Sequence, residues 1–115
     1  MNIGVIFAGG VGKRMNSRIK PKQFINVYGK PIIIHTMEIF DNHPDIDAIA
    51  VACLADWIDY LEGLVDRFNL KKVKKIVPGG SNGQESIYRG LKAAEEIAAG
   101  EKSIVLVHDG VRPLI

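Results

Sequence analysis

The sequence predicts an α/β domain with a mainly parallel β-sheet. Four short apolar runs alternate with longer segments whose apolar residues recur at helical spacing, a pattern typical of parallel strands joined by crossover helices. The chain has 115 residues, of which 47% are hydrophobic and 24% are charged, so we expect a single core of ordinary size.

The four apolar runs are the expected strands, and they cover residues 3–8, 48–53, 73–77 and 103–107. The second run contains Cys53, the only cysteine of the chain, which has no partner for an internal disulfide. We expect it to pack as a small hydrophobic residue, which suits a reducing cytoplasm.

Two helices are expected between the first three strands. One begins near Pro31, which suits a first helical position, and the other follows Asp56 as its N-cap. The residues predicted to face the core are Ile33, Met37 and Phe40 in the first helix, and Trp57, Leu61, Leu64, Val65 and Phe68 in the second.

A third helix is expected before the fourth strand. It begins near Gln84, where Asn82 and Glu85 resemble a capping box, and Gly100 is its expected stop. The residues predicted to face the core are Ile87, Leu91 and Ala94.

The charge distribution argues against a duplex nucleic acid as the partner. The net charge is only +2, and the basic residues are scattered or lie near predicted loops, so a local phosphate ligand fits better. The lysines at positions 71, 72, 74 and 75 are expected to form a solvated surface.

No apolar segment approaches the roughly 20 residues that span a bilayer, and the first segment is too short for a signal peptide, so we expect a cytoplasmic protein.

The segment after the first strand has the composition of a phosphate-binding loop. Flexible small residues are followed at once by two cations: Ala8, Gly9, Gly10 and Gly12, then Lys13 and Arg14. Glycines also serve tight strand-to-helix turns, but the Lys-Arg pair favours a triphosphate ligand.

This loop departs from both common glycine motifs. Phe7 stands where a P-loop has its first glycine, and Arg14 stands where its Ser or Thr would hold magnesium. Met15 replaces the third glycine of a dinucleotide fingerprint. The segment therefore indicates a different kind of nucleotide site.

A second basic element follows in Lys20-Pro21-Lys22-Gln23-Phe24. Pro21 biases Lys20 away from a helix, so the two lysines lie on an extended or turn segment and Lys22 can point at a fixed spot. Together with Gly29-Lys30-Pro31, residues 8–31 are interpreted as one long functional loop, because most strand-to-helix connections are shorter.

Two further loops follow the third and fourth strands. Residues 78–86 place three glycines and several hydrogen-bonding side chains before a helix, which fits either a capped turn or a pocket for the small polar edge of cytosine. Asp109 follows the fourth strand, where it suits Mg²⁺ held against phosphate oxygens. The alternative is an Asp-Gly turn in which Arg112 pairs with Asp109.

The histidines at positions 35, 43 and 108 lack zinc-ligand spacing and are expected to be structural or exposed.

Together, these segments resemble the family of 2-C-methyl-D-erythritol 4-phosphate and ribitol-5-phosphate cytidylyltransferases over the whole chain. The resemblance rests on residues 8–15, 21–24, 29–31, 35–36, 79–80, 84–86, 90–91, 108–109 and 112–113, in this order. It implies a Rossmann-like three-layer sandwich of the nucleotide-diphosphosugar transferase type. Residues 1–115 would be the N-terminal, nucleotide-binding part of a single domain, truncated after the fourth strand.

The resemblance also implies an activity, in which a polyol phosphate attacks the α-phosphorus of CTP and pyrophosphate leaves. Arg14 and Lys22 would be catalytic and stabilise the transition state, and Asp109 would bind Mg²⁺. The nucleotide-binding residues would be Ala8, Gly9, Gly10, Gly12, Lys13, Gly79, Gly80, Gln84, Ser86 and Arg112, with Gly80 and Ser86 reading cytosine. Such transfers need little covalent help, because fixed positive charge near the developing negative oxygens supplies most of the catalysis.

The chain departs from the family pattern at Gly83, where the family usually has arginine. The polyol-phosphate-binding residues, a second acidic metal contact and the dimerisation arm are expected beyond residue 115. Residues 1–115 alone should therefore be inactive, and the full-length enzyme a homodimer. Val111 and the Asp56-Trp57 pair slightly favour ribitol-5-phosphate, and thus cell-wall polyol synthesis, over 2-C-methyl-D-erythritol 4-phosphate and isoprenoid synthesis.

Two other functions remain open from the sequence. A sugar-phosphate nucleotidyltransferase that uses GTP or UTP shares the first loop, although Gln23-Phe24 and residues 109–113 argue against it. The second is a nucleotide-binding fragment without turnover.

Overall fold

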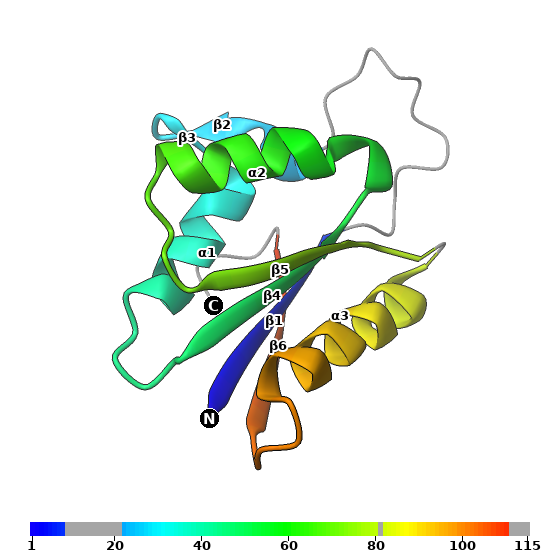
Figure 1. The fold of residues 1–115 in the computed structure, drawn as a ribbon. Helices are drawn as coiled ribbons and strands as arrows, with labels where there is room; N and C mark the ends of the chain where they lie inside the picture. The colour runs from blue at the N-terminus through cyan, green and yellow to red at the C-terminus, as the bar shows by residue number, and fades with distance from the viewer. Residues whose placement is uncertain (9–21, 81, 111–115) are drawn as a thin grey trace.

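The computed structural model describes residues 1–8, 22–80 and 82–110. Its main sheet has four parallel strands in the order β5-β4-β1-β6, formed by Val73–Pro78, Ala48–Cys53, Asn2–Ala8 and Ile104–Asp109. Helices α1 (Ile32–Asp41) and α2 (Ile58–Arg67) cover one face, and α3 (Gly83–Ala98) covers the other (Figure 1). The predicted three-layer fold with a parallel sheet is confirmed, as are its four strands.

The two central strands, β1 and β4, are buried on both faces, as parallel strands between helical layers usually are. Successive side chains point to opposite faces. Ile6 and Val51 therefore lie in the core under α1 and α2, whereas Val5 and Ala50 lie in the core under α3. Ile33 and Met37 of α1 are fully buried in the first of these cores, as predicted.

Helix α3 meets the sheet through a stripe of small buried residues: Ser86, Gly90, Ala93, Ala94 and Ala98. The prediction that Leu91 faces inward is wrong, since its side chain is 39% exposed, and Ile87 is only half-buried. Small residues let the helix backbone approach closely, and this turns the larger Leu91 away from the contact.

The predicted helix starts are partly corrected. Pro31 is the N-cap of α1, with an extended ψ of 146°, and Ile32 is the first helical residue. Asp56 caps no helix, because it lies inside a short 3₁₀ turn, Ala55–Trp57, and Trp57 takes the N-cap position of α2.

The cap of α3 follows the sequence prediction. The Asn82 side chain accepts a 2.8 Å hydrogen bond from the backbone N–H of Glu85. At the other end, Ala99 and Gly100 adopt positive φ values of 52° and 88°, which stop the helix as predicted.

The interpretation of residues 8–31 as one long loop is wrong for the part that the structure describes. Lys22–Phe24 form a 3₁₀ turn, followed by a hairpin of β2 (Asn26–Val27) and β3 (Lys30–Pro31). The hairpin turn has positive φ at both central residues, 53° at Tyr28 and 81° at Gly29, as a tight type I′ turn requires. This hairpin leads directly into α1.

Candidate functional site

The strand order reverses between β1 and β6, which is where an open α/β sheet of this kind has its ligand crevice. The chain proceeds outward from β1 to β4 and β5, and then returns to place β6 on the other side of β1. In open α/β sheets, ligands bind beyond the carboxyl ends of the strands at such a reversal point. Ala8 and Asp109 are the last residues of these two strands, so two of the predicted site residues flank this point.

Gly110 holds the two strand ends together. Its N–H donates a 3.0 Å hydrogen bond to the carbonyl oxygen of Phe7, and its own carbonyl accepts a 3.0 Å hydrogen bond from Oγ1 of Thr36. A Cβ atom on residue 110 would lie only 3.1 Å from Cβ of Ala8. Glycine therefore permits the close approach of the Asp109-Gly110 turn to the end of β1.

Asp109 has the chemistry to bind Mg²⁺ together with waters and substrate phosphates. It is half-buried at the end of β6, in register with Phe7 of β1. Within residues 1–8, 22–80 and 82–110, no cluster of three or more His, Cys, Asp and Glu side chains is placed to hold a metal ion by itself. One carboxylate fits Mg²⁺, since this ion is usually held by one or two carboxylates together with waters and substrate phosphates.

The 3₁₀ turn Lys22–Phe24 is fixed against the end of β1. The Gln23 side chain is 1% exposed, and its Nε2 donates a hydrogen bond to the carbonyl oxygen of Ala8. Phe24 is fully buried and stacks on Trp57, with ring centroids 5.1 Å apart. The backbone of the predicted catalytic Lys22 therefore lies beside the start of the glycine-rich segment.

The loop after β5 is also tied down at this edge. The Gly79 N–H donates to the Cys53 carbonyl at 2.7 Å, and the Gly80 N–H donates to Oγ of Ser86 at 3.1 Å. Ser86 is fully buried. The structure thus brings Gly80 and Ser86 together, as a turn packed on the start of α3, while Gln84 in the first turn of that helix is exposed.

Several predicted site residues lie outside the described part of the chain. They are Gly9, Gly10, Gly12, Lys13, Arg14 and Arg112, together with the side chain of Lys22. Their roles stay predictions.

The histidine side chains contact nearby backbone groups. His35 Nε2 lies 2.5 Å from the Val27 carbonyl, and His108 Nδ1 lies 2.7 Å from the Asp109 carbonyl. His43 Nδ1 accepts a 3.1 Å hydrogen bond from the Asp45 N–H. These contacts give each ring a local structural role.

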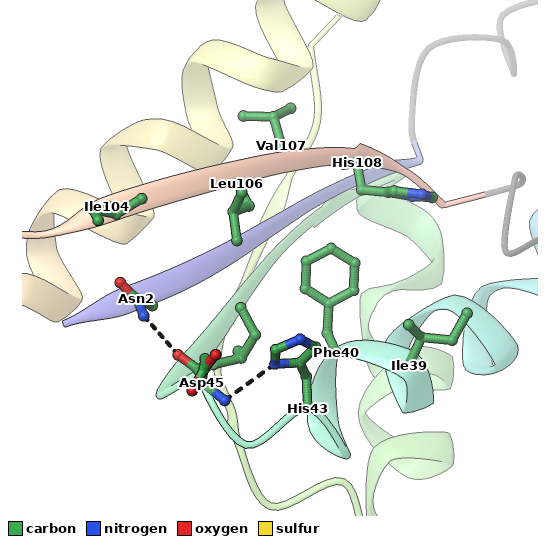
Figure 2. Close-up of a pocket in the computed structure, with 10 residues that line it drawn as sticks. Asn2, Ile39, Phe40, His43, Asp45, Ile104, Leu106, Val107 and His108 are labelled. Atoms are coloured by element: carbon green, nitrogen blue, oxygen red, sulfur yellow. Dashed lines mark hydrogen bonds between the residues drawn. The ribbon is translucent and has the colours of Figure 1, made fainter. Parts of the chain in front are cut away.

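Figure 2 shows a different cavity, a groove of about 450 Å³ between α1 and β6. Its lining is mostly apolar and includes Ile39, Phe40, Ile104 and Leu106. Three of these four side chains are substantially exposed: Ile39 by 50%, Ile104 by 64% and Leu106 by 48%. The groove has the character of an uncovered packing surface rather than of a triphosphate site.

A family model described as 2-C-methyl-D-erythritol 4-phosphate cytidylyltransferase (IspD) matches residues 3–115. The chain belongs to this family. The match spans both strand ends of the crevice, the turn at Lys22, and the loop that leads into α3. In the described residues of this family member, no helix is long and apolar enough to cross a membrane.

The relatives of this IspD family member are named for two different substrates. A ribitol-5-phosphate cytidylyltransferase of Streptococcus agalactiae serotype Ia is 63% identical over 115 residues, which are 100% of this chain and 48% of the relative. A 2-C-methyl-D-erythritol 4-phosphate cytidylyltransferase of Clostridium botulinum strain 657 is 43% identical over 114 residues, or 99% of this chain and 48% of the relative. The chain spans about half the length of the curated relatives that it matches.

The fold is that of solved IspD enzymes. The crystal structure of the Francisella tularensis 2-C-methyl-D-erythritol 4-phosphate cytidylyltransferase (IspD) matches with a TM-score of 0.67 and 26% identity, over 99% of this chain and 46% of that one. The confirmed parallel sheet therefore corresponds to about half of that chain.

Two residues beside the candidate site were not assigned a role from the sequence. Gln23 was used only within sequence segments and Thr36 only as part of the family resemblance, yet both are buried, and they bond to Ala8 at the end of β1 and to Gly110 just after β6. A signal for Thr36 was present, because it lies three residues after Ile33 and one before Met37, on the predicted buried face of α1. A polar residue on such a face must find a hydrogen-bond partner inside the protein.

Proposed function

We propose that the complete protein containing these residues is a CTP-dependent cytidylyltransferase that transfers CMP to a polyol phosphate and releases pyrophosphate. One observation carries the proposal: the end of β1, the Lys22 turn and Asp109 gather at the reversal point of the sheet in a member of the IspD family. That is the place where an α/β sheet of this kind binds a nucleotide.

The binding roles follow from the position of each loop. Ala8 leads into the glycine-rich residues that we assign to the triphosphate, together with Lys13 and Arg112. The turn at Gly79 and Gly80, with Ser86 and Gln84 behind it, is assigned to cytosine. The hydrogen bond from the Gly80 N–H to Ser86 supports this assignment, because it fixes the backbone of the turn whose remaining polar groups would meet the base.

The reaction is an in-line displacement at phosphorus. An oxygen of the polyol phosphate forms a bond to the α-phosphorus of CTP, the bond to the bridging oxygen breaks, and that oxygen leaves with pyrophosphate. Arg14 and Lys22 stabilise the negative charge that builds up on the reacting oxygens. Asp109 would hold Mg²⁺, which neutralises charge on the phosphates when it is bound.

The favoured acceptor is ribitol-5-phosphate, with 2-C-methyl-D-erythritol 4-phosphate second. The 63% identity to an enzyme named for ribitol-5-phosphate supports this order, as do Val111 and the Asp56-Trp57 pair. The pathway would then be that of a cell-wall polyol rather than of isoprenoids. We further propose that the full-length protein is a cytoplasmic homodimer and that residues 1–115 alone do not turn over.

The test is a pyrophosphate-release assay on the complete protein with Mg²⁺, each of the four nucleoside triphosphates, and either polyol phosphate or a sugar 1-phosphate as the acceptor. CTP with ribitol-5-phosphate should give the highest kcat/KM, and calorimetry should show tighter binding of CTP than of GTP or UTP. Equal or tighter binding of GTP would contradict the cytosine pocket. Turnover of UTP or GTP with a sugar 1-phosphate would favour the other nucleotidyltransferase class, and CTP binding without turnover with either acceptor would favour a binding protein.

A further inference from the structure

Two buried polar side chains hold the strand ends of the crevice to the layer that contains the Lys22 turn and α1. Gln23 is 1% exposed and donates to the Ala8 carbonyl, and Thr36 is 0% exposed and donates to the Gly110 carbonyl at 3.0 Å. Both acceptors are backbone groups at the edge where the nucleotide would bind. The two bonds span 15 and 74 residues of sequence, so they join segments that are remote along the chain.

Neither residue is needed simply to fill the core. Both have strongly apolar neighbours: Phe24 follows Gln23, and Ile33 and Met37 flank Thr36 on α1. An apolar side chain of the same size would fill this space without the cost of burying a polar group. A buried hydrogen bond adds little net stability but specifies one arrangement of its two partners, which indicates a positioning role.

Each bond fixes a different part of the proposed site. Gln23 adjoins Lys22 and bonds to Ala8, so it sets the Lys22 backbone against the start of the glycine-rich segment. Thr36 projects from a helix and bonds to the residue directly after Asp109. Because the Gly110 N–H also bonds to Phe7, this turn is held from two sides.

We propose that Gln23 and Thr36 are positioning residues for nucleotidyl transfer: Gln23 sets the place of Lys22, and Thr36 sets the place of Asp109. The inference rests on the proposed cytidylyl transfer. It assigns no contact with the substrate to either residue, and its effect should therefore appear in kcat more than in CTP affinity.

The first test uses Thr36→Val in the complete protein, a change that keeps the shape and removes the hydroxyl. We expect kcat to fall about ten- to a hundredfold, with the KM for CTP changed by less than about threefold, because a small displacement of a catalytic group slows the reaction far more than it weakens binding. The Mg²⁺ concentration for half-maximal rate should rise. Thr36→Ser, which keeps the hydroxyl, should restore most of the rate.

The control is Ile34→Val, which trims a fully buried side chain on the same helix without touching either hydrogen bond. It should lower the melting temperature, as a trimmed core side chain does, while keeping the parental kcat. If the two variants lost activity in proportion to stability, the role of Thr36 would be structural only.

A second readout needs no turnover. Thr36→Val should raise the hydrogen-exchange rate of the Gly110 amide by about tenfold or more, whereas Ile34→Val should not, because only the former releases the turn. Unchanged exchange together with unchanged kcat would overturn the assignment of Thr36. If the parent released no pyrophosphate from CTP, the proposed function would fail, while the exchange rates would still show whether Thr36 holds the turn.

For Gln23 the variants are Gln23→Met, which keeps the length, and Gln23→Asn, which keeps the amide but cannot reach Ala8. Both should lower kcat about tenfold or more and leave the Mg²⁺ requirement at the parental value, which separates them from Thr36→Val. A folded Gln23→Met protein, as judged by its melting curve, that has parental kcat would overturn the role of Gln23. If the methionine variant does not fold, parental kcat in Gln23→Asn would overturn that role equally.

Discussion

A Cβ atom on Gly90 would lie 2.5 Å from Cγ1 of Val5, so α3 and β1 are packed with no room for a methyl group between them. Val5 is fully buried and its branched side chain has little rotamer freedom. We expect Gly90→Ala to destabilise the protein, because overpacking costs about 1–3 kcal/mol and exceeds the gain of up to about 1 kcal/mol in helix propensity. The midpoint of urea unfolding measures the change.

Gly63 provides the matched control. It lies in the interior of α2, and a Cβ built there meets no atom within 4 Å. Gly63→Ala should therefore raise the free energy of unfolding by about 0.5–1 kcal/mol. The packing explanation for Gly90 would be wrong if both substitutions were stabilising.

The contact between α3 and β1 shows why the fold could be predicted from the sequence while the buried face of α3 could not. Apolar runs that are buried on both sides give a strong strand signal, and Asn82 gives a strong cap signal, so these elements were found. Leu91 was assigned inward because a large apolar residue usually marks the buried face of a helix. In α3 the contact is made by glycine, serine and alanine, whose burial carries almost no hydrophobic signal.

The sequence indicated which segments make up the candidate site, but it did not indicate the hydrogen bonds that join them. Ala8, Gly80 and Asp109 were placed at or near strand ends because glycine turns and carboxylates there stand out in the sequence, and the structure puts them there, while their roles stay predictions. The hydrogen bonds of Gln23 and Thr36 join residues 15 and 74 positions apart, and no local pattern encodes such a pairing. The hairpin at Tyr28 was missed for a similar reason, since a two-residue strand leaves no alternation of apolar residues to detect.

Cys53 should be unreactive in the folded protein. It is fully buried at the end of β4, and burial, with a smaller contribution from Glu62, raises the pKa of its thiol to about 12. Because the thiolate is the reactive form, alkylation at neutral pH should be slow in the native protein and fast in urea, as followed by mass spectrometry. Rapid labelling of the native protein would contradict the buried placement.

The same raised pKa predicts a loss of stability at alkaline pH. Above the ordinary thiol pKa of 9.0 the unfolded thiol releases its proton, whereas the folded thiol keeps it up to a pKa of about 12. The folded state then binds more protons, so the free energy of unfolding should fall by up to about 1.4 kcal/mol per pH unit in this window. Urea unfolding at about pH 8 and about pH 10 should show a larger fall for the parent than for Cys53→Ala, and equal falls would contradict the prediction.

The groove between α1 and β6 predicts self-association of residues 1–115. Ile104 and Leu106 expose apolar surface along a strand at the edge of the sheet, and such strands promote association. Leu106→Lys should reduce the association measured by light scattering. Tyr28→Lys, which adds the same charge at a hairpin tip that is 95% exposed, should leave it unchanged.

In the complete protein, Leu106→Lys should be destabilising. We expect further chain to pack on this groove there, so a buried lysine should lower the melting temperature. An unchanged melting temperature would indicate that the groove is open in the complete protein as well.

Arg14 and Lys22 are expected to act on the transition state rather than on folding or CTP binding. Arg14 follows the glycine-rich segment and Lys22 follows Pro21, and neither residue belongs to an apolar stripe in the sequence. Positive charge near the reacting phosphate matters most as pyrophosphate leaves, so Arg14→Met or Lys22→Met in the complete protein should lower kcat about 10²–10³-fold. CTP affinity and melting temperature should change little. The control is Lys71→Met, which removes an exposed lysine remote from the carboxyl ends of the strands and should retain the parental kcat. A variant that turns over normally, or that loses activity only because it unfolds, would show that its side chain does not act on the reacting phosphate.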